Sequence, residues 1–173
     1  MNNLESLSKI LTRGIGRSEI DLVIHAVEQK PILFNDLVLL FLSNQEPESR
    51  QAAWVVDILT ERHPDWIKPW IEEMTMKIPE FRHDGLKRHT LRMLCGLPLP
   101  VENLGLLIQK CFDFLVTHES IAVKVYAMEI LYRASLQEPD LKKELADTIS
   151  WRLSEESPGV RNRALKILKK LSC

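Results

Sequence analysis

The chain has 173 residues, of which 45% are hydrophobic and 27% are charged, and its formal net charge at pH 7 is −1. This composition is typical of one globular domain, and the near-neutral balance argues against a broadly basic protein that coats nucleic acid. The longest apolar run, residues 37–42, is too short to cross a bilayer, and the three cysteines, odd in number and without Cys-x-x-Cys spacing, indicate reduced thiols.

The first part of the chain predicts a short helical pair that differs from the later helices. Residues 3–12 place leucine and isoleucine on one side of a helix, and Gly14 and Gly16 interrupt it. Ser18 then caps a second helix that extends to Gln29. Because end repeats of a helical array have one face in water, we expect residues 1–30 to form an atypical capping pair. This stretch lacks the apolar core of a signal peptide, so we expect a cytoplasmic protein.

From Pro31 onward the hydrophobic pattern has the period of an α-helix and is divided by short turns. No segment alternates with a period of two over enough residues to require a strand, so the predicted fold class is all-α. Pro69 should kink the helix at residues 65–78 unless it lies in the first turn, because proline removes a backbone donor and clashes with the preceding turn. Four helix pairs are expected, at residues 32–42 with 49–62, 65–78 with 86–97, 101–117 with 120–136, and 140–153 with 157–171.

The second helices of these pairs share one position on their apolar stripe, which we call the anchor. The anchors are Ala52, Leu91, Ala127 and Ala164, separated by 39, 36 and 37 residues. A near-constant period in this range predicts a stack of helix pairs in which each pair covers the next. All four anchors should therefore be buried.

Two of these second helices resemble the second helix of a HEAT repeat, which opens with Val-Arg/Lys-x-x-Ala. Val160-Arg161 precedes Ala164 at this spacing, and Val123-Lys124 precedes Ala127 in the same way. The resemblance covers residues 31–173 and is looser in the other units. It implies one domain over residues 1–173, built as a right-handed α-α superhelix of about five antiparallel helix pairs. Such motifs identify an architecture and not an activity.

The residues that carry catalytic or metal chemistry do not gather into a motif. The five histidines include no i, i+4 pair and have no paired cysteines nearby, so a zinc site is not indicated. The six glycines form no phosphate-binding loop, and no Gly-x-Ser-x-Gly turn is present. We therefore expect no catalytic centre, no metal and no cofactor, in a protein that is not an enzyme.

Stacked second helices present a continuous face that repeat proteins use for binding. Helical geometry places on this face the residues two before, two after and five after each anchor. Aromatic and methionine side chains in its middle, with acids and lysines toward opposite ends, favour a scaffold that binds a peptide or helix of another protein. Alternatively, Trp54 and Tyr132 pack between adjacent second helices. The candidate partner-binding residues are Arg50, Trp54, Asp57, Glu61, His89, Met93, Glu129, Tyr132, Lys166 and Lys169.

The sequence leaves two other functions open. The basic C-terminal helix offers a contact for nucleic acid without catalysis. In addition, Trp54 and Asp57, about one helical turn apart, resemble the Trp and Asp of HEAT-like alkylpurine DNA glycosylases. There the ring faces a cationic damaged base and the carboxylate faces the sugar. The near-neutral charge argues against a glycosylase, because affinity for DNA depends on neutralising phosphates. A basic run such as that of the last helix is more often the solvated outer face of a terminal repeat.

Overall fold

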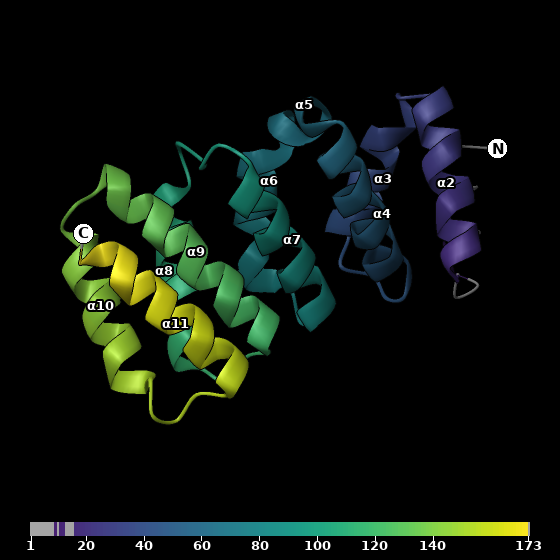
Figure 1. The fold of residues 1–173 in the computed structure, drawn as a ribbon. Helices are drawn as coiled ribbons and strands as arrows, with labels where there is room; N and C mark the ends of the chain where they lie inside the picture. Colours follow the sequence, from purple (N-terminus) through teal and green to yellow (C-terminus); the bar gives the residue numbers. More distant parts are fainter. Residues whose placement is uncertain (1–8, 10, 13–15, 173) are drawn as a thin grey trace.

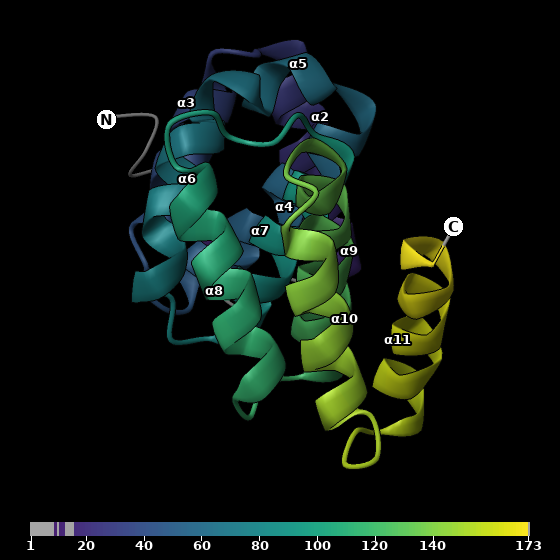
Figure 2. The ribbon, with the colours of Figure 1, turned by 90° about the vertical axis from the view of Figure 1, so that its left-hand side faces the viewer.

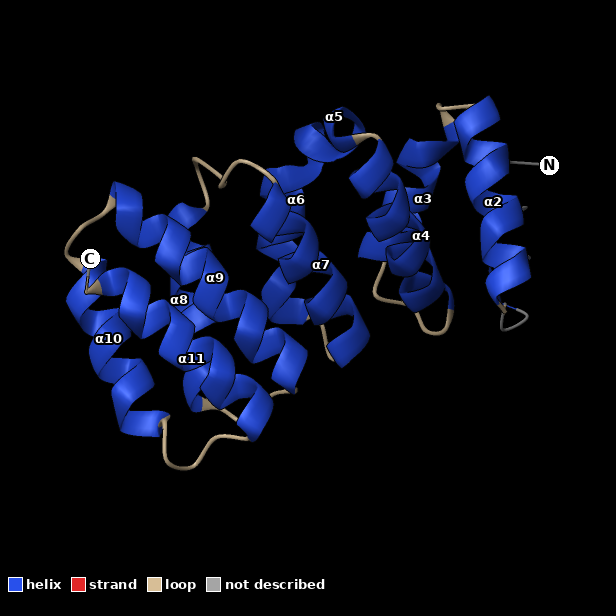
Figure 3. Ribbon diagram, in the orientation of Figure 1, coloured by secondary structure: helices blue, strands red, loops and turns tan. Residues whose placement is uncertain are grey.

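A computed structural model describes residues 9, 11, 12 and 16–172. Every regular element in this part of the chain is helical, and Figure 3 contains no strand there, so the predicted all-α fold is confirmed. Most of the helix expected at residues 3–12 lies outside the described residues. The elements are α2 (Arg17–Gln29), α3 (Leu33–Leu42), α4 (Glu48–Arg62), α5 (Pro64–Ile67), η1 (Lys68–Trp70), α6 (Ile71–Lys77), η2 (Ile78–Glu80), α7 (Asp84–Gly96), α8 (Leu104–Val116), α9 (Ile121–Gln137), α10 (Leu141–Arg152) and α11 (Pro158–Leu171).

The helices form two layers of a solenoid (Figure 1). In one layer α4 packs against α7, α7 against α9, and α9 against α11; in the other, α8 contacts both α6 and α10. Turned by 90°, the molecule shows α6 and α8 on one side and α9 and α11 on the other (Figure 2). Each pair is closed by contacts between its own helices, as in α3 with α4 and α8 with α9. The α2 helix packs against α4 and covers that end of the second-helix layer.

The anchors confirm the predicted register of the stack. Ala52, Leu91 and Ala127 are 0% exposed, and Ala164 is 2% exposed. In α11 the Ser157 hydroxyl accepts a hydrogen bond from the backbone N–H of Val160 at 3.5 Å, which satisfies a donor of the first turn. Burial then recurs at Val160, Ala164 and Ile167. The small anchors let the backbones of neighbouring second helices approach closely.

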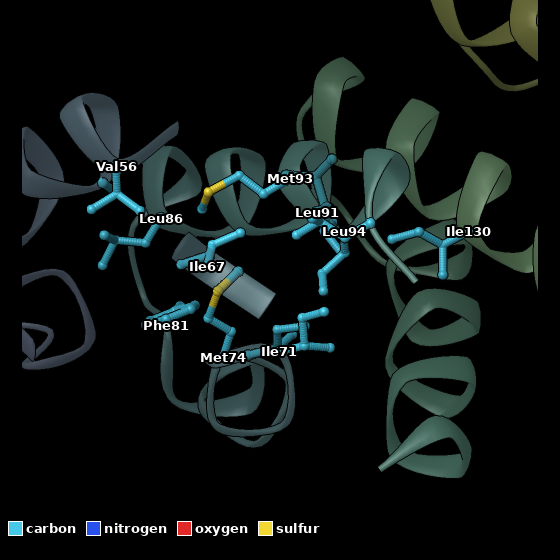
Figure 4. Close-up of a cluster of buried hydrophobic side chains, with 14 of the residues drawn as sticks. Val56, Ile67, Ile71, Met74, Phe81, Leu86, Leu91, Met93, Leu94 and Ile130 are labelled. Atoms are coloured by element: carbon cyan, nitrogen blue, oxygen red, sulfur yellow. The ribbon is translucent and has the colours of Figure 1, made fainter. Parts of the chain in front are cut away.

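Pro69 breaks the helix expected at residues 65–78. The chain forms α5, then the 3₁₀ turn η1 around the proline, and then α6, because Pro69 has no N–H to donate to the preceding turn. The apolar stripe nevertheless continues across the break. Ile67, Ile71 and Met74 are all buried and point toward the α7 side chains (Figure 4).

The α8 helix begins three residues later than the expected start at Val101. The Glu72 carboxylate explains this difference, because it accepts hydrogen bonds from the backbone N–H groups of Val101 and Asn103 at 2.6 and 3.0 Å. It also accepts one from the Asn103 side chain at 2.9 Å. These contacts hold the residues before α8 in a turn and tie that turn to α6.

Candidate partner-binding surface

Neighbouring repeats are joined by side chains that cross from one second helix to the start of the next unit's second helix. The two lysine pairs are short and largely buried: the Lys124 and Glu156 side chains are 6% and 11% exposed, and their charged atoms are 2.5 Å apart. Removing two charges from water costs several kcal/mol each, so such pairs require close geometry. The set comprises Arg50 with His83, Lys87 with Glu119, and Lys124 with Glu156.

A polar cluster lies between α4 and α7, built around Asp57. This carboxylate is 3% exposed, and its Oδ2 atom accepts hydrogen bonds from His89 Nδ1 at 2.6 Å and Arg92 Nε at 2.7 Å. Arg92 also donates to Glu61 at 2.7 Å. Its hydrogen bond with Asp57 is the largest cause of a pKa well above the ordinary arginine value. We call Asp57, His89, Arg92 and Glu61 the α4–α7 cluster.

His89 has a defined tautomer in this cluster. Arg88 Nη2 lies 3.0 Å from His89 Nε2. Because a guanidinium group only donates hydrogen bonds, Nε2 must be the acceptor, and the proton is on Nδ1, where it is donated to Asp57. A chain of hydrogen bonds therefore runs from the exposed Arg88 through His89 to the buried Asp57.

An open hollow of about 240 Å³ lies above this cluster, and we call it the α4–α7–α9 hollow. Three successive second helices contribute to it. Trp54, Ile58 and Tyr126 are half-buried and pack against the core, so each shows one apolar side to the hollow. The remaining lining residues are Asp57, Arg88, His89 and Arg92. A second hollow of about 340 Å³ is also lined by Asp57 and Arg92, together with Glu61 and Met93.

Three of the candidate residues are less exposed than the sequence predicts. Met93 is 3% exposed, and its sulfur accepts a hydrogen bond from the Thr60 hydroxyl at 3.4 Å, so its expected place as an exposed anchor is wrong. Figure 4 shows it in the same apolar cluster as Ile67. His89, at 8% exposure, and Asp57 are likewise buried. The reason is geometric: adjacent second helices lie close together, and these positions face the seam between them.

Toward the C-terminal end, the candidate residues Glu129 and Tyr132 of α9 contact basic residues of α11 that were not among the candidates. Glu129 accepts a hydrogen bond from Arg163 at 3.2 Å and lies 3.6 Å from the Lys170 ammonium. That ammonium is 4.7 Å from the centre of the Tyr132 ring, a cation–π distance. Lys166 and Lys169 are exposed.

Much of the positive charge of α11 is therefore used within the molecule. Besides the contacts of Arg163 and Lys170, Arg161 donates to three backbone carbonyls of the turn between α10 and α11, those of Leu153, Ser154 and Glu156. These bonds tie the Arg161 guanidinium to that turn, although the side chain stays exposed. The basic helix is consequently a weaker surface for phosphates than its composition indicates.

Sequence reasoning missed Ile58, Arg88 and Tyr126, which line the hollow together with Trp54. Ile58 lies one helical turn after Trp54, so a wider predicted face would have included it. Tyr126 belongs to the position just before an anchor, which the predicted face left out. Its presence in the hollow depends on how α9 lies against α7, which sequence periodicity does not define.

The two cysteines among the described residues, Cys95 and Cys111, do not add a reactive group. Burial is the main cause that raises the pKa of Cys95 to about 12, and burial also raises the pKa of Cys111 well above its ordinary value. Both therefore remain protonated at neutral pH, and thiols in that state are poor nucleophiles and metal ligands. Across the described residues, no group of three or more His, Cys, Asp or Glu side chains is placed to hold a metal ion. None of the described helices has the length and apolar composition needed to cross a bilayer.

Comparison with protein families gives a match to the HEAT repeat domain over residues 7–171. The chain belongs to the HEAT repeat domain family. No characterised protein and no solved structure matched the chain in the corresponding comparisons. HEAT repeats generally act as scaffolds for protein–protein interaction, using the surface that stacked repeats create. In this HEAT domain, the α4–α7–α9 hollow lies where three consecutive second helices meet.

Proposed function

We propose that this HEAT repeat domain is a non-catalytic scaffold that binds a peptide or helical segment of another protein along α4, α7, α9 and α11. The observation that carries the proposal is the α4–α7–α9 hollow. It is open, it is lined by side chains from three successive repeats, and half-buried Trp54 and Ile58 of α4 and Tyr126 of α9 form its apolar walls. A pocket of about 240 Å³ suits one large side chain of a partner and not a whole cofactor.

The energetics of such a surface depend on its aromatic residues. A central aromatic side chain that is desolvated by a partner contributes about 2 kcal/mol or more on truncation. Exposed ion pairs contribute only about 0–1 kcal/mol each. The charged residues near the hollow and along α11 would therefore set the direction of the bound segment more than its affinity.

The alternative functions receive less support. Asp57 lies beneath the surface and is hydrogen-bonded to Arg92 and His89, whereas a glycosylase would need its carboxylate to face the sugar of bound DNA. For nucleic-acid binding, the cations of α11 should be available to phosphates. Arg163 and Lys170 are instead paired with Glu129.

Partner capture with matched tryptophan variants tests the proposal. Wild-type protein, Trp54→Ala and Trp151→Ala would be immobilised and exposed to cell extract with and without nuclease. Trp151 is a suitable control because it is 68% exposed on α10 and does not line the hollow. We expect the same proteins to be retained by the wild type and by Trp151→Ala, to be lost from Trp54→Ala, and to be insensitive to nuclease. Circular dichroism would establish that each variant is folded.

Two outcomes would contradict the proposal. If nuclease removes the retained proteins, nucleic acid mediates the interaction. If folded Trp54→Ala retains them as well as the wild type does, the hollow is not the binding surface. A separate assay of alkylpurine release from damaged DNA tests the expected absence of catalysis.

A further inference from the structure

We infer that the α4–α7–α9 hollow recognises an acidic segment of a protein partner: a carboxylate placed on Arg88, next to an apolar side chain seated on Trp54 and Ile58. This inference rests on the proposed scaffold function and specifies the chemistry of the partner. It is carried by three features of the hollow, namely an uncompensated cation, a hydrogen bond that orients this cation, and an apolar wall beside it.

The cations of α7 differ in how they are compensated. Arg92 is bonded to Asp57 and Glu61, and Lys87 to Glu119. Arg88 is exposed, and among the described residues it pairs with no carboxylate; its hydrogen bond goes to the neutral ring of His89. Of the charged groups that line the hollow, Arg88 and Arg92 are cations and Asp57, bonded to Arg92, is the carboxylate. Glu61, which shares Arg92 with Asp57, does not line this hollow. The lining therefore carries net positive charge and includes one cation, Arg88, without a carboxylate partner.

Arg88 is also oriented before any partner arrives. Its Nη2 atom donates to His89 Nε2 at 3.0 Å, and His89 is in turn fixed by Asp57 at 2.6 Å. A guanidinium group has five N–H donors in a rigid plane, so this contact leaves donors for a second acceptor. Carboxylates accept two parallel hydrogen bonds from such a group, which makes the pair both stronger and more selective than a point charge.

The apolar wall strengthens this preference. Trp54 and Ile58 of α4 and Tyr126 of α9 place apolar surface around the α7 cations that line the hollow, and an ion pair formed beside apolar surface is screened less than one in open solvent. A basic segment would meet Arg88 and Arg92 without an available carboxylate. Selectivity for acidic over basic segments therefore comes from repulsion as well as attraction.

Nuclear magnetic resonance with two matched peptides tests the inference. The probes are blocked tetrapeptides of sequence Glu-Leu-Phe-Glu and Lys-Leu-Phe-Lys, titrated into the isotope-labelled full chain. We expect the acidic peptide to shift the Trp54 indole N–H and the Arg88 side-chain signals, and to bind at least about tenfold more tightly than the basic peptide. Arg88→Gln should remove this difference, Arg88→Lys should retain part of it, and Arg82→Gln, an exposed arginine outside the hollow, should leave it unchanged.

Several results would overturn the inference. These are equal or tighter binding of the basic peptide, acidic-peptide shifts confined to α11, no shift at Trp54 with either peptide at millimolar concentration, or an Arg88→Gln variant that behaves as the wild type. Stronger shifts of the same signals by a short DNA duplex would also overturn it. The two proposals can fail separately. If Trp54→Ala releases a captured protein but Arg88→Gln does not, the scaffold function stands and the acidic preference is wrong; if folded Trp54→Ala releases nothing, the scaffold function at this hollow is wrong.

Discussion

Removal of the Asp57 carboxylate tests whether the α4–α7 cluster stabilises the packing of α4 against α7. This carboxylate is 3% exposed and accepts hydrogen bonds from His89 and Arg92. A hydrogen bond to a charged group contributes about 1.5–3 kcal/mol, and a buried donor left without an acceptor costs about 1–3 kcal/mol. Because the Arg92 side chain is 34% exposed, water replaces part of its lost contact. Asp57→Ala should therefore lower the free energy of unfolding by about 3 kcal/mol.

Urea denaturation followed by circular dichroism measures this change, provided that the dependence of the unfolding free energy on urea concentration has the same slope in the variant and the wild type. Asp57→Asn keeps an acceptor oxygen and should cost only about 1–2 kcal/mol. Glu61→Gln removes a carboxylate that is 62% exposed from the same Arg92 and should cost about 0–1 kcal/mol. If Asp57→Ala unfolds with the wild-type free energy, the carboxylate is not a structural group, and a role toward a ligand becomes the better explanation of its position.

Three further predictions concern stability and reactivity. Lys124→Ala leaves the Glu156 carboxylate, which is only 11% exposed, without its ammonium partner. It should lower the free energy of unfolding by about 3 kcal/mol in the same urea assay. A loss below about 1 kcal/mol would show that this ion pair does not stabilise the contact between the two repeats. Burial would raise the pKa of Glu72, but hydrogen bonds from Asn103 and from backbone N–H groups before α8 outweigh it and lower the pKa. The wild type should therefore have a higher free energy of unfolding than Glu72→Gln at pH 7, and this difference should disappear as the pH falls below about 4. Urea denaturation of both proteins at each pH measures it, and a difference that does not change with pH would refute the prediction. Since burial raises the pKa of Cys95 to about 12, iodoacetamide at pH 8 should not modify it in the folded protein; rapid alkylation at this site in peptide mass spectrometry would refute this.

The sequence predicted the stack because periodicity is a local property of each helix. Ala52 and Ala164 repeat the same position on their apolar stripes, and both are buried. Pro69 was correctly expected to disturb its helix, since its effect depends only on its own ring. The structure shows that Pro69 lies in a 3₁₀ turn between α5 and α6, and that Ile67 and Ile71 on either side of this turn are both buried.

The candidate surface could be predicted only in outline. Periodicity shows which side of a helix faces away from its anchor, but not where the next helix lies. The distance between α4 and α7 places Met93 in the core, whereas it leaves Trp54 half-buried beside a hollow. Tyr126 was missed for the same reason, because its place in the hollow depends on the packing of α9 on α7.

Charged residues were the least predictable, because their roles depend on partners far away in sequence. Lys124 belongs to the HEAT opening of α9, yet it is 5% exposed and bonded to Glu156 of the next unit. Arg161 has the same position in α11 and bonds instead to backbone carbonyls. Charge density along a helix thus overestimates the charge that a ligand meets.

The affinity of a captured protein partner, measured against salt for matched variants, tests the scaffold proposal most directly. Trp54→Ala should weaken binding by at least about tenfold, because a central aromatic residue contributes about 2 kcal/mol or more. The paired change of Lys166→Gln and Lys169→Gln should alter affinity only modestly, since exposed charges contribute about 0–1 kcal/mol each. The opposite pattern, in which folded Trp54→Ala binds normally while the lysine variant and added salt abolish binding, would contradict the account and indicate a polyanionic partner.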